Sequence, residues 1–340
     1  TGTTPLEARL QGFPAIGIDA NPISVLATRV KLSWDIDLDA VLTRLSDILA
    51  LASACLRKVS LGPIPAGIHQ LPLFNPWIVD ADSGGWVEQG FDPAALLPAE
   101  AMALLPRGFI SRKPLLRVLA VRYAIEQLVP PGNLRDLFAL ALANTIVGTA
   151  GNIAFGPEIY SLPPRDDADV LGAFSSMVTT MIADFQEILT RQSRPFPPGI
   201  VFQDDARMLS SLDLLPPAGV VITSPPYPNE KDYTRSTRLE SVLLGLIRTR
   251  QDLRRLKGSL LRSNTRNVFA GDDDDRFVQD IPSVLRLARD IEERRLQLGK
   301  TSGFERLYHR VTLLYFGLSL IHISEPTRLL SISYAVFCLK

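Results

Sequence analysis

The chain combines short apolar runs with longer stretches in which apolar residues recur at helical spacing. Ala15–Ile18, Ile200–Gln203 and Ala218–Ile222 are short runs of the kind typical of strands, and the last is expected to be a buried parallel strand. Apolar residues three and four positions apart predict amphipathic helices over Asp37–Lys58 and Asp166–Gln192. Short strands that share a chain with amphipathic helices indicate an α/β fold.

The same spacing predicts the other helices. Thr3 or Thr4 is expected to cap the first helix, with Pro5 in its first turn. A helix that starts near Thr237 is expected to run to about Leu256. The remaining expected helices are Asn21–Lys31, Lys113–Leu128, Asn133–Val147, Pro282–Leu298 and Phe304–Gly317.

The strands and helices are distributed unevenly along the chain. Residues 36–198 are mainly helical and lie between the expected strands Ala15–Ile18 and Ile200–Gln203. We therefore expect a core in two parts, 1–35 and 199–317, which is interrupted by a large helical insertion at 36–198. The insertion either caps the core or contributes to recognition of a target.

Composition and charge narrow the function classes. Lysine plus arginine equals aspartate plus glutamate, at 36 each, so any nucleic-acid surface has to be local. The two cysteines exclude a zinc ribbon and a disulfide framework, and Cys55 is expected to be a core thiol. Leu137–Phe155 has no formal charge but contains polar residues, so we expect a buried core helix rather than a membrane span. The sequence shows no secretory leader, so a cytoplasmic location is expected.

Both ends of the sequence differ from an ordinary domain. The chain begins at Thr1 without an initiator Met, and segment 318–340 resembles the translated read-through of a sequencing adapter. We therefore expect an internal fragment of a longer gene. Segment 318–340, with His322 and Cys338, is excluded from functional reasoning.

Residues Thr223–Tyr227 form the most distinctive turn of the sequence. Pro225 and Pro226 fix φ at about −65° and push the residue before each into extended geometry. The resulting stiff corner presents the Ser224 hydroxyl, a backbone carbonyl and the Tyr227 ring together. This set suits a flat ring with an exocyclic amino group, because the oxygens accept its hydrogens while the ring stacks on the tyrosine. An ordinary proline-rich turn after a strand is the alternative.

On Ser224-Pro225-Pro226-Tyr227 the chain resembles the S-adenosylmethionine-dependent DNA amino-methyltransferases, which methylate adenine N6 or cytosine N4. Gly2-Thr3-Thr4 is similar to the end of that family's cofactor loop, and Gly17–Pro22 is similar to its second cofactor element. The resemblance covers about 1–31 and 200–317. It implies a Rossmann-like methyltransferase core with an incomplete sheet, because the start of the cofactor loop and the strand before it are absent. In the family that strand lies in the middle of the sheet.

The cofactor residues follow partly from the pattern and partly from the resemblance. Asp19 stands at the C-terminal end of a strand in a βαβ unit, where an acidic side chain accepts hydrogen bonds from ribose hydroxyls. The resemblance implies S-adenosylmethionine as the cofactor, with Gly2, Thr3 and Asn21 at its site. It also implies that Asp205 contacts the cofactor adenine.

The resemblance implies methyl transfer at the proline-rich turn. The Ser224 hydroxyl and the Pro225 carbonyl would accept the amine hydrogens, Pro226 would stiffen the corner, and Tyr227 would stack on a base flipped out of DNA. A serine at this position favours cytosine N4. The alternatives are adenine N6, an RNA amino-methyltransferase and, from another class, a non-catalytic nucleic-acid binder.

The segment after the turn is locally basic, and DNA is the expected partner. Lys231, Arg235 and Arg238 are the residues that we expect at DNA phosphates, although a solvated helix face would also explain them. The basic segment continues through Arg248, Arg250, Arg254, Arg255, Lys257, Arg262 and Arg266. A companion restriction endonuclease is a further partner that the resemblance leaves open.

Other polar residues are expected to be structural. Asp272–Asp275 lacks the spacing of a calcium loop and is expected to be a solvated loop, and no metal is expected. His69 and His309 are isolated in the sequence, so both are interpreted as structural or surface residues.

Overall fold

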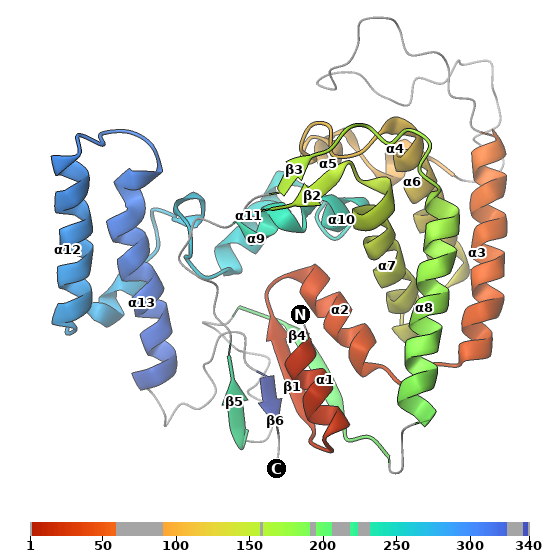
Figure 1. Ribbon diagram of the computed structural model, residues 1–340, viewed down its shortest axis with the longest axis horizontal. Helices are drawn as coiled ribbons and strands as arrows, with labels where there is room; N and C mark the ends of the chain where they lie inside the picture. Colours follow the sequence, from red (N-terminus) through yellow and green to blue (C-terminus); the bar gives the residue numbers. More distant parts are fainter. Residues whose placement is uncertain are drawn as a thin grey trace, which may run out of the picture. The chain divides into compact units, whose positions relative to one another are not determined.

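The computed structural model describes residues 2–58, 91–156, 159–190, 195–205, 218–223, 232–324 and 336–338. The chain separates into two units (Figure 1). The sheet unit contains Thr1–Thr28, Phe196–Thr234 and Arg254–Lys340, and the helical unit contains Arg29–Pro195 and Arg235–Leu253. The expected insertion at 36–198 thus corresponds closely to the first segment of the helical unit, whereas 235–253 was expected in the core.

The sheet has the strand order β4-β1-β6-β5. β1 (Ala15–Asp19) pairs in parallel with β4 (Gly199–Gln203), and β6 (Val336–Cys338) pairs antiparallel with both β1 and β5 (Val220–Ile222). Since β1 and β5 both oppose β6, strands β1, β4 and β5 run in one direction. The protein is therefore α/β with a small, partly parallel sheet.

Part of segment 318–340 has regular structure. α13 (Tyr308–Ser324) extends beyond the expected helix end at Gly317, and β6 lies between β1 and β5. In this position β6 is one of the two inner strands of the four-stranded sheet.

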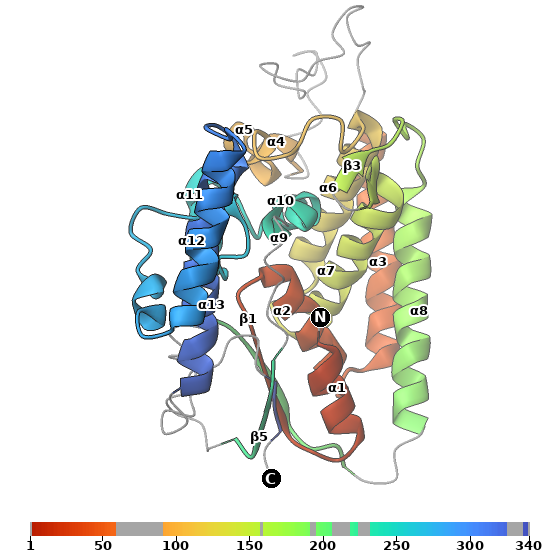
Figure 2. The ribbon, with the colours of Figure 1, turned by 60° about the vertical axis from the view of Figure 1, so that its left-hand side comes forward.

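Helix α1 (Thr3–Leu10) packs against β1 and β4 in the sheet unit (Figure 2). The expectation that Thr3 or Thr4 caps this helix was wrong. Its N-cap is Gly2, which adopts φ 69°. A glycine is required here because a Cβ at this position would lie 2.7 Å from Thr28 Oγ1. Pro5 lies in the first turn, as expected.

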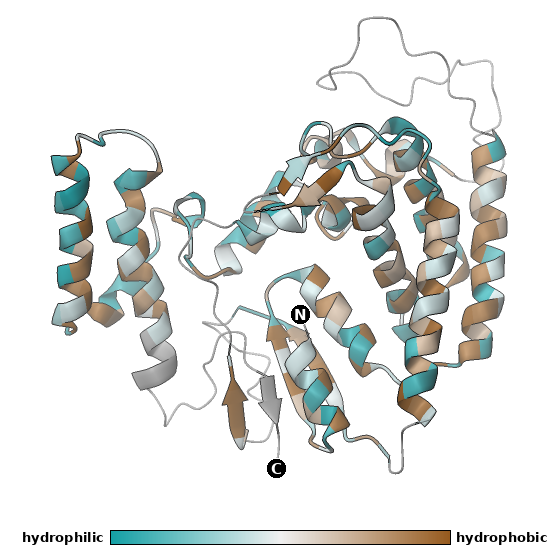
Figure 3. Ribbon diagram, viewed as in Figure 1, coloured by the Kyte–Doolittle hydropathy of each residue, from teal (hydrophilic) through white to brown (hydrophobic). Residues whose placement is uncertain are grey.

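The strands of the sheet differ in burial. Four of the five residues of β1 are buried, but Ile200 in β4 is 45% exposed, and Val220 and Ile222 in β5 are 49% and 46% exposed. Figure 3 shows the apolar character of β5. The expectation of a buried strand at Ala218–Ile222 was wrong, because both faces of β5 retain solvent access.

The helical unit is built around α3 (Leu38–Lys58), α6 (Arg112–Leu128), α7 (Asn133–Thr145) and α8 (Val170–Thr190), which pack side by side (Figure 1). Their shared core is apolar, and Cys55 is buried in this unit, as expected. Fully buried residues from these helices include Ile48, Val118, Leu119, Leu137, Phe138 and Phe174. The helical spacing predicted most of the core-forming faces of α3 and α8, but Leu42 and Leu189, which the same spacing places on these faces, are 49% and 39% exposed.

Shorter elements complete the helical unit. α7 continues into a π-helical turn, Ile146–Ala150, before β2 (Ile153–Phe155) pairs antiparallel with β3 (Ile159–Ser161). α4 (Pro93–Leu96) and α5 (Ala99–Met102) precede α6. No helix within the described residues has the length and apolar character needed to cross a membrane.

The region after the proline-rich turn is not the single helix that was expected. It contains α9 (Tyr233–Ser236), α10 (Arg238–Leu243) and α11 (Arg250–Ser259). α10 ends because Gly245 adopts φ 73° and its N–H binds the Val242 carbonyl, which closes the helix.

The part of the sheet unit between α11 and β6 is mainly helical in its described residues. η3 (Thr265–Asn267) and η4 (Asp274–Val278) are 3₁₀ turns, and α12 (Pro282–Gln297) begins with a proline, as expected. η5 (Phe304–Leu307) leads into α13. α13 packs on η4 and α12.

Candidate functional site

The candidate cofactor site lies at the carboxyl edge of the sheet. β1 ends at Asp19 and β4 ends at Gln203, and these two residues are register partners in the parallel pair. The Asp204 N–H donates to the Asp19 carbonyl at 3.3 Å, and Gln203 Nε2 donates to the Ala20 carbonyl at 3.4 Å. The structure therefore brings the loops that carry Asp19 and Asp205 together.

The sequence after β1 folds as a tight acidic turn. Asp19 Oδ1 accepts the Asn21 N–H at 2.8 Å, and Asn21 Oδ1 accepts the Ile23 N–H at 3.0 Å. Asn21 thereby caps α2 (Pro22–Leu32). These bonds orient the Asp19 carboxylate at the end of the strand and also give Asn21 a structural role.

Burial perturbs the acidity of Asp19. Loss of solvent raises the pKa of its carboxyl to about 6, although the Asn21 N–H and Ser24 hydrogen bonds act in the opposite direction. The carboxylate is ionised above this pH. An ionised, partly accessible acceptor beside a strand end fits the hydroxyl groups of a ribose.

Gly2 and Thr3 have different environments. Gly2 adopts a left-handed conformation beside Thr28, so close packing between α1 and α2 is sufficient to explain the glycine. Thr3 is exposed at the first position of α1. Its hydroxyl is therefore accessible to a ligand near this helix terminus.

The proline-rich turn itself, Ser224-Pro225-Pro226-Tyr227, and Lys231 lie outside the described residues. The residue before the turn, Thr223, follows β5 directly and is exposed. Because β5 runs in the same direction as β1 and β4, the chain enters the turn from the carboxyl edge that carries Asp19 and Asp205.

The described cations of the basic segment are divided between exposed and buried positions. Arg235 and Arg238 are half-buried, whereas Arg248, Arg250, Arg254 and Arg255 are exposed. Arg262 is only 2% exposed and pairs with Asp272, and the Lys257 ammonium lies 2.8 Å from an Asp232 carboxylate oxygen. Arg262 and Lys257 are therefore structural cations.

The acidic run also differs from the expected solvated loop. The Asp272 side chain is 5% exposed and Asp274 is 6% exposed, whereas Asp273 faces solvent and pairs with Arg276. His309 is not isolated, because its Nδ1 lies 3.2 Å from Glu292 Oε2. His69 lies outside the described residues.

Sequence reasoning did not identify two buried polar features. One is the ion pair between Arg262 and Asp272, and the other is Glu240, whose pKa is raised to about 7 by burial. Glu240 is 5% exposed, and its Oε2 has no hydrogen-bond partner. The sequence does show an arginine near an acidic run and a single acid among apolar helix residues. It does not show that these side chains are buried, because burial depends on tertiary contacts.

Comparisons with protein-family models, with curated proteins and with solved structures find no match to this chain.

Proposed function

We propose that this protein is an S-adenosylmethionine-dependent DNA methyltransferase that acts on the exocyclic amino group of a flipped base, with cytosine N4 as the target. One observation carries the proposal. Asp19, Asp205 and the entry to the Ser224-Pro225-Pro226-Tyr227 turn follow three strands that run in one direction, so all three lie at one edge of the sheet. Ligands of open α/β sheets bind at this edge.

The chemistry assigns one role to each group. S-adenosylmethionine would supply a methyl group on a sulfonium. Asp19 would accept hydrogen bonds from its ribose, and Asp205 would contact its adenine. The Ser224 hydroxyl and the Pro225 carbonyl would accept the amine hydrogens and so orient the nitrogen lone pair, while Tyr227 holds the base by stacking. The sulfonium would supply the methyl group to the amine nitrogen and leave as a neutral thioether, and the proton lost from the nitrogen would pass to solvent.

Nucleic-acid binding would rely on local positive charge. The exposed guanidinium groups of Arg254 and Arg255 lie on α11, and the half-buried Arg235 lies on α9 after the turn. Since the chain has no net charge, we expect phosphate contacts to be confined to such a strip.

The test is a methyl-transfer assay. The protein is incubated with DNA and labelled S-adenosylmethionine. After digestion to nucleosides, label in N4-methylcytosine is expected. Label only in N6-methyladenine would move the target to adenine, and label only in RNA would identify the RNA enzyme. No label in any nucleoside would reject the proposal.

Variants separate cofactor binding from catalysis. Ser224→Ala and Tyr227→Ala are each expected to lower turnover roughly 10- to 100-fold without unfolding the protein. Asp19→Asn is expected to weaken cofactor binding, measured by titration calorimetry, whereas Asp290→Asn on the exposed side of α12 serves as the control and should bind normally. Equal cofactor affinity in both variants would remove the role assigned to Asp19.

A further inference from the structure

α10 (Arg238–Leu243) joins the helical unit from a distant part of the sequence. Residues 235–253 belong to this unit together with Arg29–Pro195. α10 packs on the π-helical turn Ile146–Ala150, which follows α7 (Figure 1). The contact is close, because a Cβ on Gly151 would lie 2.9 Å from Leu239 Cδ2. Side-chain burial must hold so short a helix in place, since its backbone bonds alone do not stabilise it.

The buried residues of α10 include an ionisable one. Leu239, Val242 and Leu243 are at most 1% exposed, and Glu240 is 5% exposed. Glu240 Oε2 has no hydrogen-bond partner, and the hydroxyl of Ser241, the next residue, is also buried without one. A buried carboxylate without partners loses its hydration and gains nothing in return, so the neutral acid is favoured at such a position.

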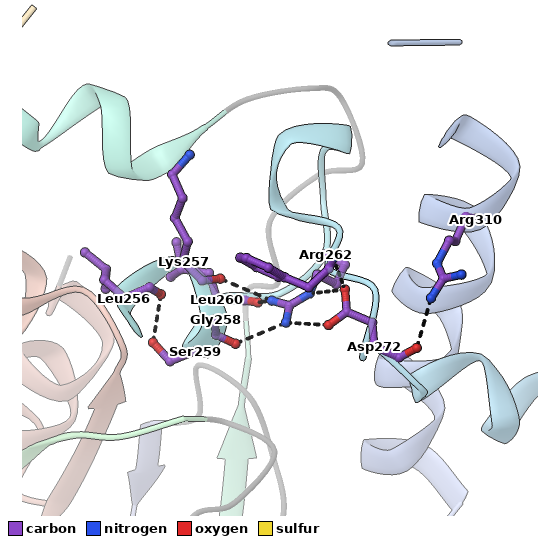
Figure 4. Close-up of polar contacts among 9 residues, drawn as sticks. Leu256, Lys257, Gly258, Ser259, Leu260, Arg262, Asp272 and Arg310 are labelled. Atoms are coloured by element: carbon purple, nitrogen blue, oxygen red, sulfur yellow. Dashed lines mark hydrogen bonds and ion pairs between the residues drawn. The ribbon is translucent and has the colours of Figure 1, made fainter. Parts of the chain in front are cut away.

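The ion pair of Arg262 and Asp272 shows what a buried charge requires. Nε of Arg262 lies 2.9 Å from Oδ2 of Asp272, Nη2 lies 2.8 Å from Oδ1, and the two side chains are 3% and 5% exposed. The guanidinium also donates to the carbonyls of Lys257 and Gly258 (Figure 4). Each charge is thus offset by the other. Glu240 has no ion-pair partner among the described residues, so its ionisation would leave a charge that nothing offsets.

Arg122 of α6 is a cation that reaches α10, but it is paired with other groups. Its Nη1 donates to the Leu243 carbonyl at the end of α10, and its Nε binds Glu126 Oε1 at 2.8 Å. The π-helical turn has no titratable residue, and Arg238 is half-buried at the start of α10. Burial raises the pKa of Glu240 from 4.5 to about 7, and its own backbone N–H acts in the opposite direction.

We propose that α10 is attached to the helical unit through a proton-sensitive contact. The helix stays docked while the Glu240 carboxyl is protonated, and it undocks locally as that carboxyl ionises. This contact is independent of the proposed function, so no methyl transfer is needed to test it. It gives the helical unit a conformational response to pH that the apolar packing of α3, α6, α7 and α8 would not give.

The direction of the effect follows from the two states of the carboxyl. In the undocked helix the carboxyl is hydrated and titrates near its ordinary pKa of 4.5, whereas in the docked helix its pKa is about 7. The docked state therefore binds more protons between these values. Its advantage falls as pH rises from 4.5 to about 7, by up to about tenfold in the docking equilibrium per pH unit. At higher pH both states are ionised, and docking no longer depends on this carboxyl.

Native-state amide hydrogen exchange tests the contact. Three amides report on α10, because Ser241 N–H binds the Thr237 carbonyl, Leu244 N–H binds the Glu240 carbonyl and Leu246 N–H binds the Ser241 carbonyl. Their protection factors, corrected for the intrinsic pH dependence of exchange, are expected to fall about 10- to 100-fold between about pH 5 and pH 8. Their protection should also depend less on urea than that of α3 amides, because local undocking exposes less surface than unfolding.

Glu240→Gln keeps the size of the side chain and removes its charge. In this variant the α10 amides should match the wild type at about pH 5 and be about 10- to 100-fold more protected at about pH 8. The matched control is Glu187→Gln, the same substitution at an exposed position of α8, which should reproduce the wild-type fall. The wild-type pH profile is measured without any substitution, so it tests the contact even if Glu240→Gln does not fold.

Three results would overturn the proposal. Constant protection of the wild-type α10 amides across this pH range would show that the Glu240 carboxyl reaches solvent in the docked helix. An equal fall in Glu240→Gln would assign the pH response to another group. The same urea dependence for α10 and α3 amides would show that α10 opens only when the whole unit unfolds.

Discussion

The helical unit and the sheet unit bury their apolar residues to different extents. In the helical unit, Phe138 and Phe174 are completely buried, and their ring centroids lie 6.2 Å apart. In the sheet unit, Ile200, Val220 and Ile222 keep nearly half of their surface exposed. Four amphipathic helices can enclose a core by themselves, whereas a sheet needs layers over both faces.

This difference matters for function because the candidate cofactor edge belongs to the sheet unit. Hydrogen bonds and ion pairs hold several polar side chains of the sheet unit, as at Asp19, Asp232 and Arg262. The helical unit depends on packing. Substitutions in the core of the helical unit should therefore have large effects on stability. Substitutions of polar residues in the sheet unit should change the local geometry more than the stability.

The largest effect on stability is expected for Phe174→Ala. This side chain is fully buried in α8, so its truncation leaves a cavity and should lower the free energy of unfolding by about 3–5 kcal/mol. Urea unfolding followed by circular dichroism measures the change. A loss below about 1 kcal/mol would show that the helical unit is not the tightly packed region of the comparison.

The next largest effect is expected for Gly245→Ala in the helical unit. Gly245 has φ 73°, and a Cβ there would lie 2.4 Å from Arg122 Nη2. Left-handed strain and the clash together should lower the unfolding free energy by about 2–4 kcal/mol. Gly12→Ala in the sheet unit is the matched control, because Gly12 has φ 87° with no atom within 4 Å of the added Cβ. It should cost about 1–2 kcal/mol, and equal losses would mean that Arg122 yields to the methyl group.

The pH dependence of stability distinguishes Glu240 from Asp19, two carboxyls whose pKa values are raised by burial. Burial raises the pKa of Glu240 from 4.5 to about 7, so between these values the folded protein binds more protons than the unfolded chain. The free energy of unfolding should therefore fall as pH rises from 4.5 to about 7, by on the order of 1.4 kcal/mol per pH unit.

Glu240→Gln removes this contribution, and urea titrations at several pH values measure it. In that variant the free energy of unfolding should still fall with rising pH only below about pH 6, because the pKa of Asp19 is raised from 3.8 to about 6. An unchanged pH profile in Glu240→Gln would show that this carboxyl is solvated in solution.

The smallest effect is expected for Val220→Thr in β5. The two side chains have similar shapes, and Val220 is 49% exposed, so the unfolding free energy should change by less than about 1 kcal/mol. The same thermal or urea measurement is sufficient. A loss of about 2 kcal/mol or more would show that this face of β5 is covered in solution, which would weaken the contrast between the units.

The sequence by itself determined the elements that rest on local patterns. Helical spacing identified α3, α6 and α12 to within one residue at their starts, and the apolar runs identified β1 and β4. These predictions are correct because neighbouring residues alone define an amphipathic face or a short apolar run. The start of α2 was also identified to within one residue, because the Asn21 side chain accepts the Ile23 N–H two positions away.

Only the tertiary structure decided the features that depend on distant partners. The partial exposure of β5 depends on which layers cover it, and the break after α10 depends on Gly245, which lies beside Arg122. Arg262 belongs to the basic segment of the sequence but is enclosed with Asp272, because a charge can be buried where a partner from elsewhere in the chain offsets its desolvation. A sequence shows which charges exist, but the fold decides which of them reach solvent.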